Sequence, residues 1–184
     1  MSELRTERLL LRGWRESDLA PWAAMNADPE VRAHFPGLLT REQSEASVAR
    51  FQAALKARGW GWWAVEVRAT GEFIGMTGLD PVEEAMPFTG VEAGWRLARP
   101  AWGHGYATEA AEAALAYGFT TLALPEILAL TATTNLRSQA VMRRIGMTRN
   151  PADDFDDPGA PDGPLRRSVV YRISVEEQRA KRHA

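Results

Sequence analysis

Trp102-Gly-His-Gly-Tyr-Ala-Thr-Glu-Ala110 is the stretch that decides the fold, because its two glycines lie between an expected strand and an expected long helix. The first backbone N–H groups of a helix have no acceptor within the helix, and glycine lets a phosphate approach them without a Cβ in the way. The stretch therefore predicts an anion site that fits a pyrophosphate. A tight connection that binds nothing would have the same pattern.

Two common nucleotide-binding motifs do not fit this stretch. No Gly-Lys-Ser/Thr follows the glycines, so it is not a Walker phosphate loop. Thr108 stands where a dinucleotide-binding fingerprint has its third glycine. That fingerprint also needs an acid at the end of the next strand, whereas Glu126 precedes the strand expected at residues 127–133. The sequence thus disfavours a nucleotide-binding enzyme.

Three blocks of the sequence resemble one enzyme family. Residues 92–110, read as Glu-x-Gly-Trp-x-Leu-x-x-Pro-x-Trp-Gly-x-Gly-Tyr-Ala-Thr-Glu-Ala, resemble the acyl-CoA binding motif of the GNAT superfamily of N-acetyltransferases. Residues 135–147, with Asn-Leu-Arg-Ser, Val-Met and Ile-Gly-Met, resemble that superfamily's later Asn-x-x-Ser helix and its Gly-Met exit. Residues 6–12, Thr-Glu-Arg-Leu-Leu-Leu-Arg, are similar to the first strand of the branch with the Rim-type acetyltransferases of ribosomal protein N-termini.

The pattern along the chain predicts strands that alternate with helices in one domain. Thr40 and Gln43 have the form of a capping box, and Thr70-Gly71 predicts a hairpin turn. We expect a single α/β (α+β) domain over residues 1–184, with the GNAT-like mixed, mainly antiparallel central sheet flanked by helices. Apolar periodicity places strands at 8–14, 62–67, 73–79, 91–97, 127–133 and 168–174, and helices at about 18–27, 41–58, 107–121 and 138–145, whereas 150–164 and the basic tail 179–182 are expected to be irregular and solvated.

The composition limits the classes of function. A chain of 184 residues with 45% hydrophobic residues buries a sizeable core, and its net charge of -2 gives no support for a nucleic-acid or membrane partner. The absence of cysteine excludes disulfides, thiolate metal sites and a cysteine nucleophile. His104 has no ligand partner at metal spacing, so no metal is expected. With no secretory signal and no membrane-length apolar run, we expect a cytoplasmic protein.

The resemblance implies acetyl transfer from acetyl-CoA to an amine, and it suggests which residues do the chemistry. Transfer needs a base for the amine, a donor to the tetrahedral oxygen and a proton for the leaving thiolate. Glu92 is the candidate base, as strand glutamates are in many GNAT enzymes, although a polar residue facing solvent or pairing with an arginine would look the same. Ser138 is the candidate proton donor, as in Rim-type relatives, although it would also suit the start of its helix.

The resemblance also implies the residues that bind the coenzyme. Backbone N–H groups at residues 95–97, on a strand that splays from its neighbour, would hold the oxyanion and bind pantetheine as an added strand. Asn135 would bond the pantetheine amides, or only cap its helix. Trp102 replaces the superfamily's usual Gln or Arg, so the pyrophosphate should rest chiefly on backbone N–H groups. The expected coenzyme-binding residues are Trp95, Arg96, Leu97, Trp102, Gly103, His104, Gly105, Tyr106, Ala107, Thr108, Asn135 and Arg137.

Taken together, the sequence predicts an acetyl-CoA-dependent N-acetyltransferase. The acceptor would be a primary amine, either a protein N-terminus or a small amine such as an amino-bearing antibiotic. Without cysteine, direct transfer in a ternary complex is favoured, while an acyl-serine stays open. A non-catalytic acyl-CoA sensor of the same fold is the alternative, and a homodimer stays open. Trp60, Trp62 and Trp63 are expected in the core, with an acceptor pocket as the alternative.

Overall fold

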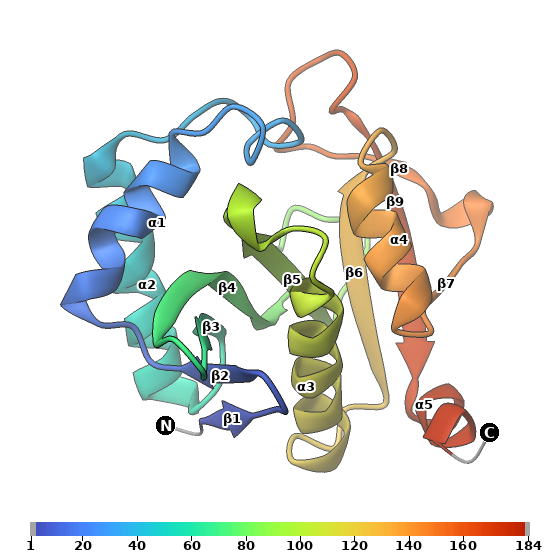
Figure 1. Cartoon of the computed structure of the whole chain (residues 1–184). Coiled ribbons are helices and arrows are strands. Elements are labelled where there is room, and N and C mark those ends of the chain that lie inside the picture. The colour runs from blue at the N-terminus through green and yellow to red at the C-terminus, as the bar shows by residue number, and fades with distance from the viewer. Residues whose placement is uncertain (1–2, 183–184) are drawn as a thin grey trace.

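The computed structural model describes residues 3–182, and its strands form one mixed sheet (Figure 1). The strands are β1 (Leu4–Arg5), β2 (Leu9–Arg12), β3 (Trp62–Val67), β4 (Glu72–Pro81), β5 (Val91–Leu97), β6 (Glu126–Ala132), β7 (Thr148–Arg149), β8 (Phe155–Asp156) and β9 (Arg167–Ser174). They lie in the order β1-β2-β3-β4-β5-β6-β9-β7, with β8 also paired to β9. The β5–β6 pair is parallel and the other pairs are antiparallel, which confirms the predicted mixed, mainly antiparallel sheet.

Helices cover both faces of this sheet. The helices are α1 (Leu19–Asn26), α2 (Arg41–Arg58), α3 (Tyr106–Thr120), α4 (Leu136–Arg144) and α5 (Val175–Arg182), with short 3-10 turns η1 (Glu16–Asp18), η2 (Arg99–Ala101) and η3 (Pro151–Asp153). Side chains of successive strand residues point to opposite faces. Trp63 is fully buried and packs edge-on against Tyr117 of α3, with ring centroids 5.4 Å apart. Its neighbour Trp62 points to the face that α1 and α2 cover, so the core expectation is confirmed for Trp63, whereas Trp60 and Trp62 are half-buried.

A buried ion-pair network fixes α1 and η1 against the sheet. Arg12 of β2 donates from Nη1 and Nη2 to the two carboxylate oxygens of Asp18, at 2.7 and 3.0 Å, and from Nε to Glu66 of β3 at 2.7 Å. This bidentate geometry is the strongest form of carboxylate–guanidinium bond. The predicted capping box of α2 is confirmed, because Thr40 and Gln43 each accept a hydrogen bond from the other's backbone N–H.

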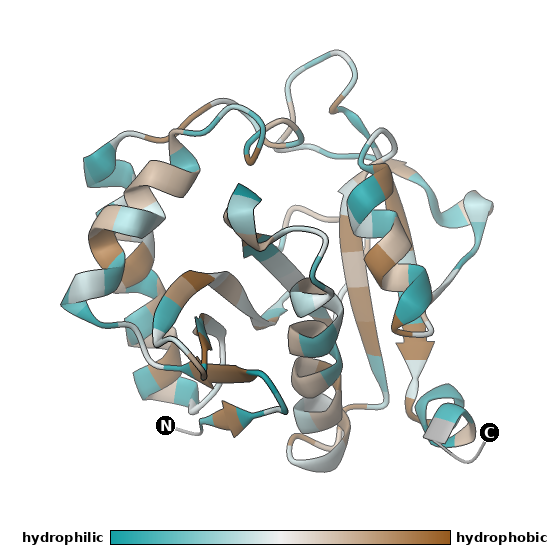
Figure 2. Ribbon diagram, in the orientation of Figure 1, coloured by the Kyte–Doolittle hydropathy of each residue, from teal (hydrophilic) through white to brown (hydrophobic). Residues whose placement is uncertain are grey.

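Strands β5 and β6 separate soon after they meet. Their register contains one pair, Glu92 with Leu128, whereas β6 pairs with β9 along its whole length. Beyond Glu92, β5 continues to Leu97 beside β4 only. This separation is the splay that the family resemblance implies. Along the splay, the backbone groups on the facing edges of β5 and β6 do not hydrogen-bond to each other. Figure 2 shows hydrophobic colouring along β2 and much of β6, in contrast to the largely hydrophilic α5.

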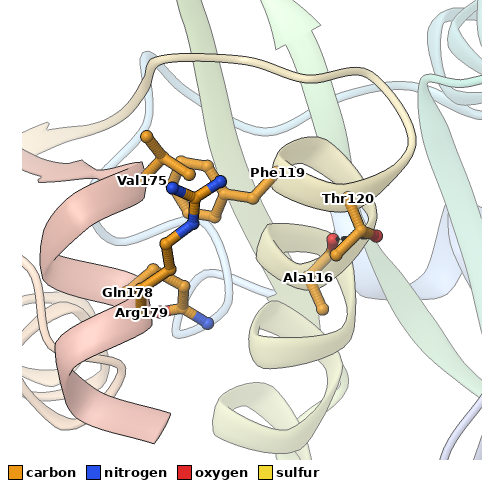
Figure 3. A pocket seen from close by; sticks show the side chains of 6 residues that line it. All are labelled: Ala116, Phe119, Thr120, Val175, Gln178 and Arg179. Carbon is orange, nitrogen blue, oxygen red and sulfur yellow. Dashed lines mark hydrogen bonds between the residues drawn. The ribbon is translucent and has the colours of Figure 1, made fainter.

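The C-terminal tail is the clearest difference from the sequence-based expectation. Residues 179–182, expected to be frayed, lie in α5. This helix begins with a capping box in which Ser174 N–H donates to Glu177 at 2.8 Å and Glu177 N–H donates to the Ser174 hydroxyl at 3.2 Å. Lys181 then donates to the Arg144 carbonyl oxygen at the end of α4. A pocket lies between α5 and the last turn of α3 (Figure 3). It is lined by Ala116, Phe119, Thr120, Val175, Gln178 and Arg179.

Two other segments differ from the expected boundaries. The segment 150–164, expected to be irregular, contains η3 and the short strand β8. Phe155 of β8 is buried, and its ring centroid lies 5.0 Å from that of Phe88. The first long strand spans four residues and does not start at Arg8, because the Arg8 N–H donates to the side chain of Glu109 and not to a neighbouring strand. No helix within residues 3–182 is long and apolar enough to cross a membrane.

Candidate active site

The glycine loop has the geometry that an anion site needs. Gly103 and Gly105 adopt φ values of +80° and +79°, a left-handed conformation that costs glycine little and strains other residues. Gly105 is the N-cap of α3, and no side chain caps this end. The first helical bond runs from Glu109 N–H to the Gly105 carbonyl oxygen at 3.1 Å. The N–H groups of residues 106–108 therefore have no acceptor within the helix, and the exposed glycines leave them open to a pyrophosphate.

Arg8, which directly precedes β2, supports this loop, a contact that the sequence did not reveal. Its guanidinium donates to the His104 carbonyl oxygen at 2.9 Å and to the Glu109 carboxylate at 2.6 Å, and it lies 4.8 Å from the ring centroid of Tyr106. The pKa of Glu109 is lowered: its burial opposes this shift, but hydrogen bonds from Thr6 and Arg8 outweigh it. Arg8 thus neutralises a carboxylate that would otherwise repel a phosphate at the start of α3.

Trp102 connects the two coenzyme blocks of the sequence. Its indole N–H donates to the Leu97 carbonyl oxygen at the end of β5, at 2.8 Å. Arg137 of α4 stacks over the same indole, with the guanidinium carbon 4.5 Å from the ring centroid. At the open end of the splay, His34 of the α1–α2 loop (residues 27–40) contacts the Thr134 hydroxyl at 3.3 Å. Residues far apart in the sequence therefore meet around the diverging strands.

The start of α4 assigns different roles to its two predicted site residues. Asn135 is the helix cap, since its Oδ1 accepts the N–H of Ser138 at 3.2 Å, and its Nδ2 donates to the Thr131 hydroxyl at 2.9 Å. Each amide atom keeps one further bonding position for a ligand. Ser138 is half-buried, and within residues 3–182 its hydroxyl has no hydrogen-bond partner. Ser138 thus lies in the first turn of α4, as the alternative expected, but the side chain that caps the helix is that of Asn135.

Glu92 lies where β5 touches both neighbouring strands. It is opposite Asp80 in β4 and Leu128 in β6, and in the described part of the chain its carboxylate forms no hydrogen bond or ion pair. Burial raises the pKa of Glu92 to about 7, and the negative charges of Asp80, Glu83 and Asp157 add to the shift. A carboxylate with this pKa is matched to proton transfer near neutral pH. Within residues 3–182 no arginine pairs with Glu92, and the residue is half-buried, so the role of general base stays a prediction.

The face of β5 that carries Glu92 also carries Gly94 and Arg96, because the three alternate along the strand. Arg96 donates to Asn26 of α1, which identifies this face as the one that α1 and α2 cover. The ring of Trp62 lies directly over Gly94, and a Cβ added to Gly94 would approach it to 2.9 Å. An indole therefore lies between the carboxylate and the guanidinium. Trp95 and Leu97 point the other way, toward α3.

The side chain of Arg96 has an environment that the sequence did not predict. Its Nη1 donates to the Asn26 amide oxygen at 2.8 Å, and its guanidinium lies 4.1 Å from the ring centroid of Phe35 and 5.3 Å from that of Trp22. Its Nε is buried and has no hydrogen-bond partner among the described residues. Burial, with the positive charge of Arg32, lowers the pKa of Arg96 to about 9, which still leaves it charged at neutral pH.

Comparison with known proteins agrees with this arrangement. Residues 8–148 match the family model described as acetyltransferase (GNAT) domain. The chain belongs to the GNAT acetyltransferase family. It is 35% identical over 147 residues to the uncharacterized protein YkkB of Bacillus subtilis, covering 79% of this chain and 85% of that protein. It is 32% identical over 163 residues to the FsC-acetyl coenzyme A-N(2)-transacetylase of Aspergillus fumigatus, covering 83% and 68%.

Solved GNAT structures share the fold along almost the whole chain. A GNAT-family acetyltransferase from Bacillus anthracis superposes with a TM-score of 0.80 at 26% identity, covering 95% of this chain and 99% of that one. RimL, a ribosomal L7/L12 alpha-N-protein acetyltransferase solved with coenzyme A, superposes with a TM-score of 0.73 at 15% identity, covering 96% and 99%. An identity this low shows the fold alone. The GNAT assignment is therefore confirmed, and membership of the Rim-type branch stays a prediction.

Proposed function

We propose that this acetyltransferase moves an acetyl group from acetyl-CoA to a primary amine by direct transfer in a ternary complex. The observation that carries the proposal is the position of Glu92, a half-buried carboxylate where β5 and β6 diverge, which has no hydrogen-bond or ion-pair partner within residues 3–182 and whose pKa is raised by burial to about 7. A non-catalytic acyl-CoA sensor would need the glycine loop but would have no use for such a group. Protein N-termini and small amines both fit the acceptor that this chemistry requires.

The coenzyme would lie across the splay. Its pyrophosphate would accept hydrogen bonds from the N–H groups of residues 106–108, beside Gly103, His104 and Gly105. Pantetheine would pair with the free edge of β5 at residues 95–97, as an added strand does. Arg137, whose guanidinium is exposed over the Trp102 ring, would approach the phosphates from α4.

Three groups of this chain would manage the protons and the charge. Acetyl-CoA supplies the acetyl group as a thioester. Glu92 would take one proton from the substrate ammonium, directly or through water, and so free the nitrogen lone pair for attack; once the C–N bond has formed, the nitrogen would lose its second proton to solvent. Backbone N–H groups at residues 95–97 would stabilise the oxyanion as the C–N bond forms. When the C–S bond breaks, the Ser138 hydroxyl would give its proton to sulfur and recover one from solvent.

A binding and turnover experiment tests the proposal. Acetyl-CoA should raise the melting temperature, because at roughly a hundred times its Kd a ligand stabilises the folded protein by roughly 2.7 kcal/mol. NAD and ATP should raise the melting temperature much less. Release of free coenzyme should then be measured with a panel of peptides and small amines. Equal shifts with NAD, or acetyl-CoA binding with no release in the presence of any amine, would overturn the proposal.

A pair of glycine variants makes the binding arm specific. Gly105→Val should raise the KM for acetyl-CoA more than it lowers turnover at saturation, because Gly105 positions phosphate and not the reacting carbonyl. Gly71→Val is the matched control, since Gly71 has a similar φ of +73° in the β3–β4 turn, away from the loop. It should lose stability and keep the wild-type KM. An unchanged KM in folded Gly105→Val would contradict the phosphate site.

A further inference from the structure

Arg96 is a half-buried cation with a fully buried Nε, and it has no counterion in the described part of the chain. Within residues 3–182 it forms no salt bridge; its one side-chain hydrogen bond goes to the neutral amide of Asn26, and its Nε has no partner. Arg99, three residues further along, provides the contrast. It pairs with Asp28 at 2.7 Å and with Glu30 at 2.6 Å, at the surface. The α1–α2 loop therefore brings carboxylates to the exposed arginine and none to Arg96.

A second arginine increases the positive charge at the same place. Arg32 of the α1–α2 loop is 7% exposed, donates from Nε to the Gly37 carbonyl oxygen at 2.9 Å, and in the described structure has no carboxylate partner. Phe35 lies against both guanidiniums, 4.8 Å from Arg32 and 4.1 Å from Arg96. Ring contacts compensate only part of the cost of burying two like charges. An anion bound beside Arg96 would offset more of this cost.

This positive site lies on the same face of β5 as the proposed base. Glu92 and Arg96 are four positions apart on one strand, a span of about 13 Å between their Cα atoms. Trp62 covers Gly94 midway along this span. A substrate with its amine at Glu92 and lying along the indole would therefore direct its other end toward Arg96. The phosphates of the coenzyme have a separate site at the start of α3.

We propose that Arg96, assisted by Arg32, binds a carboxylate carried by the acceptor, several bonds away from the amine that is acetylated. This inference rests on the proposed function, because it concerns the same acceptor site. The planar guanidinium, with its free Nε–H, presents the paired donors that a carboxylate accepts. Acceptors of this class are amino acids and acidic peptides. Polycationic amines, such as amino-bearing antibiotics, would meet repulsion there.

A binding measurement tests this site without turnover. The protein would be saturated with coenzyme A and then mixed with one ligand at a time. The ligands are the ω-amino acids aminobutanoate, aminohexanoate and aminooctanoate, which carry the amine on the terminal carbon, and the carboxamide analogue of each. At least one carboxylate should raise the melting temperature, and its amide should not. Arg96→Gln should abolish the difference, whereas Arg99→Gln, which removes an arginine that already has carboxylate partners, should retain it. Equal shifts for acid and amide in the wild type would overturn the inference.

Turnover then separates this inference from the proposed function. We expect kcat/KM for the best carboxylate acceptor to exceed that of its amide at least about tenfold, and Arg96→Gln to bring the ratio close to one. If amides and acids react equally well, the carboxylate site is wrong and the acetyltransferase proposal stands. If no amine reacts while carboxylates still bind through Arg96, the proposed function is wrong and the site stands.

A structural role for Arg96 would give a different result. If Arg96→Gln lowers the melting temperature but keeps the discrimination between acid and amide, Arg96 is only a core residue and the inference fails. Should that variant not fold, Arg96→Lys provides the same test, because it keeps the charge and removes the planar pair of donors. We expect it to lose most of the acid-over-amide preference, and full retention would overturn the inference.

Discussion

The two sides of the splayed strands differ in how their charged groups are satisfied. On the coenzyme side, Glu109 receives hydrogen bonds from Thr6 and Arg8, and the helix start is ready to accept a phosphate. On the side of α1 and α2, Glu92 and Arg96 have no ionic partners in the described structure. At the proposed coenzyme site the protein thus supplies the partners of its own charged groups, whereas the side of α1 and α2 holds charges that a ligand would have to complement.

The difference has an energetic meaning. A buried charged group without a partner lowers the stability of the folded protein, because it has lost its hydration and gained nothing in return. Such groups concentrate where chemistry or recognition needs them. Variants on the two sides should therefore behave in opposite ways: changes near the glycine loop cost both stability and binding, while changes at Glu92 cost activity and improve stability.

The largest expected effect is on the turnover of Glu92→Gln. Removal of a general base typically costs 10²–10⁴-fold, so kcat at neutral pH should fall by about that factor. Wild-type turnover should rise with pH through about 7, as the raised pKa of Glu92 is passed and the carboxylate becomes able to accept a proton. The variant should lack this step and recover only as the amine itself loses its proton. Glu83→Gln, at a neighbouring exposed carboxylate, should keep turnover within a few-fold.

The next effect is a gain in stability from the same substitution. The pKa of Glu92 in the folded protein is raised from 4.5 to about 7, so its contribution to stability is present below pH 4.5 and is lost as pH rises through 7. Above that range, folding buries an ionised carboxylate at a cost on the order of 3 kcal/mol. Glu92→Gln should therefore be more stable than wild type at about pH 8 and closely matched at about pH 4. A pH-independent difference in denaturant unfolding would contradict this.

The conformation of the glycine loop was predictable because its residues are contiguous in the sequence. The loop conformation depends on Gly103 and Gly105, and both adopt the positive φ that only glycine tolerates well. The capping box at Thr40 and the glycine at position 146 that follows the end of α4 are likewise local signals, and the structure contains both. A similar signal was present for α5, since Ser174 and Glu177 have capping-box spacing, but the basic residues that follow suggested a frayed end.

The other side was not predictable, because its character comes from contacts between distant residues. Arg96 donates a hydrogen bond to Asn26, which lies 70 positions earlier in the sequence. With a carboxylate in place of that amide, Arg96 would form an ordinary ion pair. The support of the loop by Arg8 spans a similar distance, to Glu109. Sequence periodicity gives the face on which a side chain lies, but the absence of a partner becomes visible only when all neighbouring elements are placed.

Ser138→Ala gives the smallest expected effect and decides whether α4 takes part in the chemistry. Loss of a proton donor to the leaving sulfur should lower kcat, by about tenfold or more, with little change in the KM for acetyl-CoA, since the interaction forms only in the transition state. Unlike Glu92→Gln, the variant should not recover as pH rises. Ser174→Ala is the control, because Ser174 truly caps its helix and should cost about 1 kcal/mol of stability without changing kcat. Since Asn135 and not Ser138 caps α4, wild-type turnover in Ser138→Ala would leave the serine without a role and would place the final proton transfer on water or another side chain.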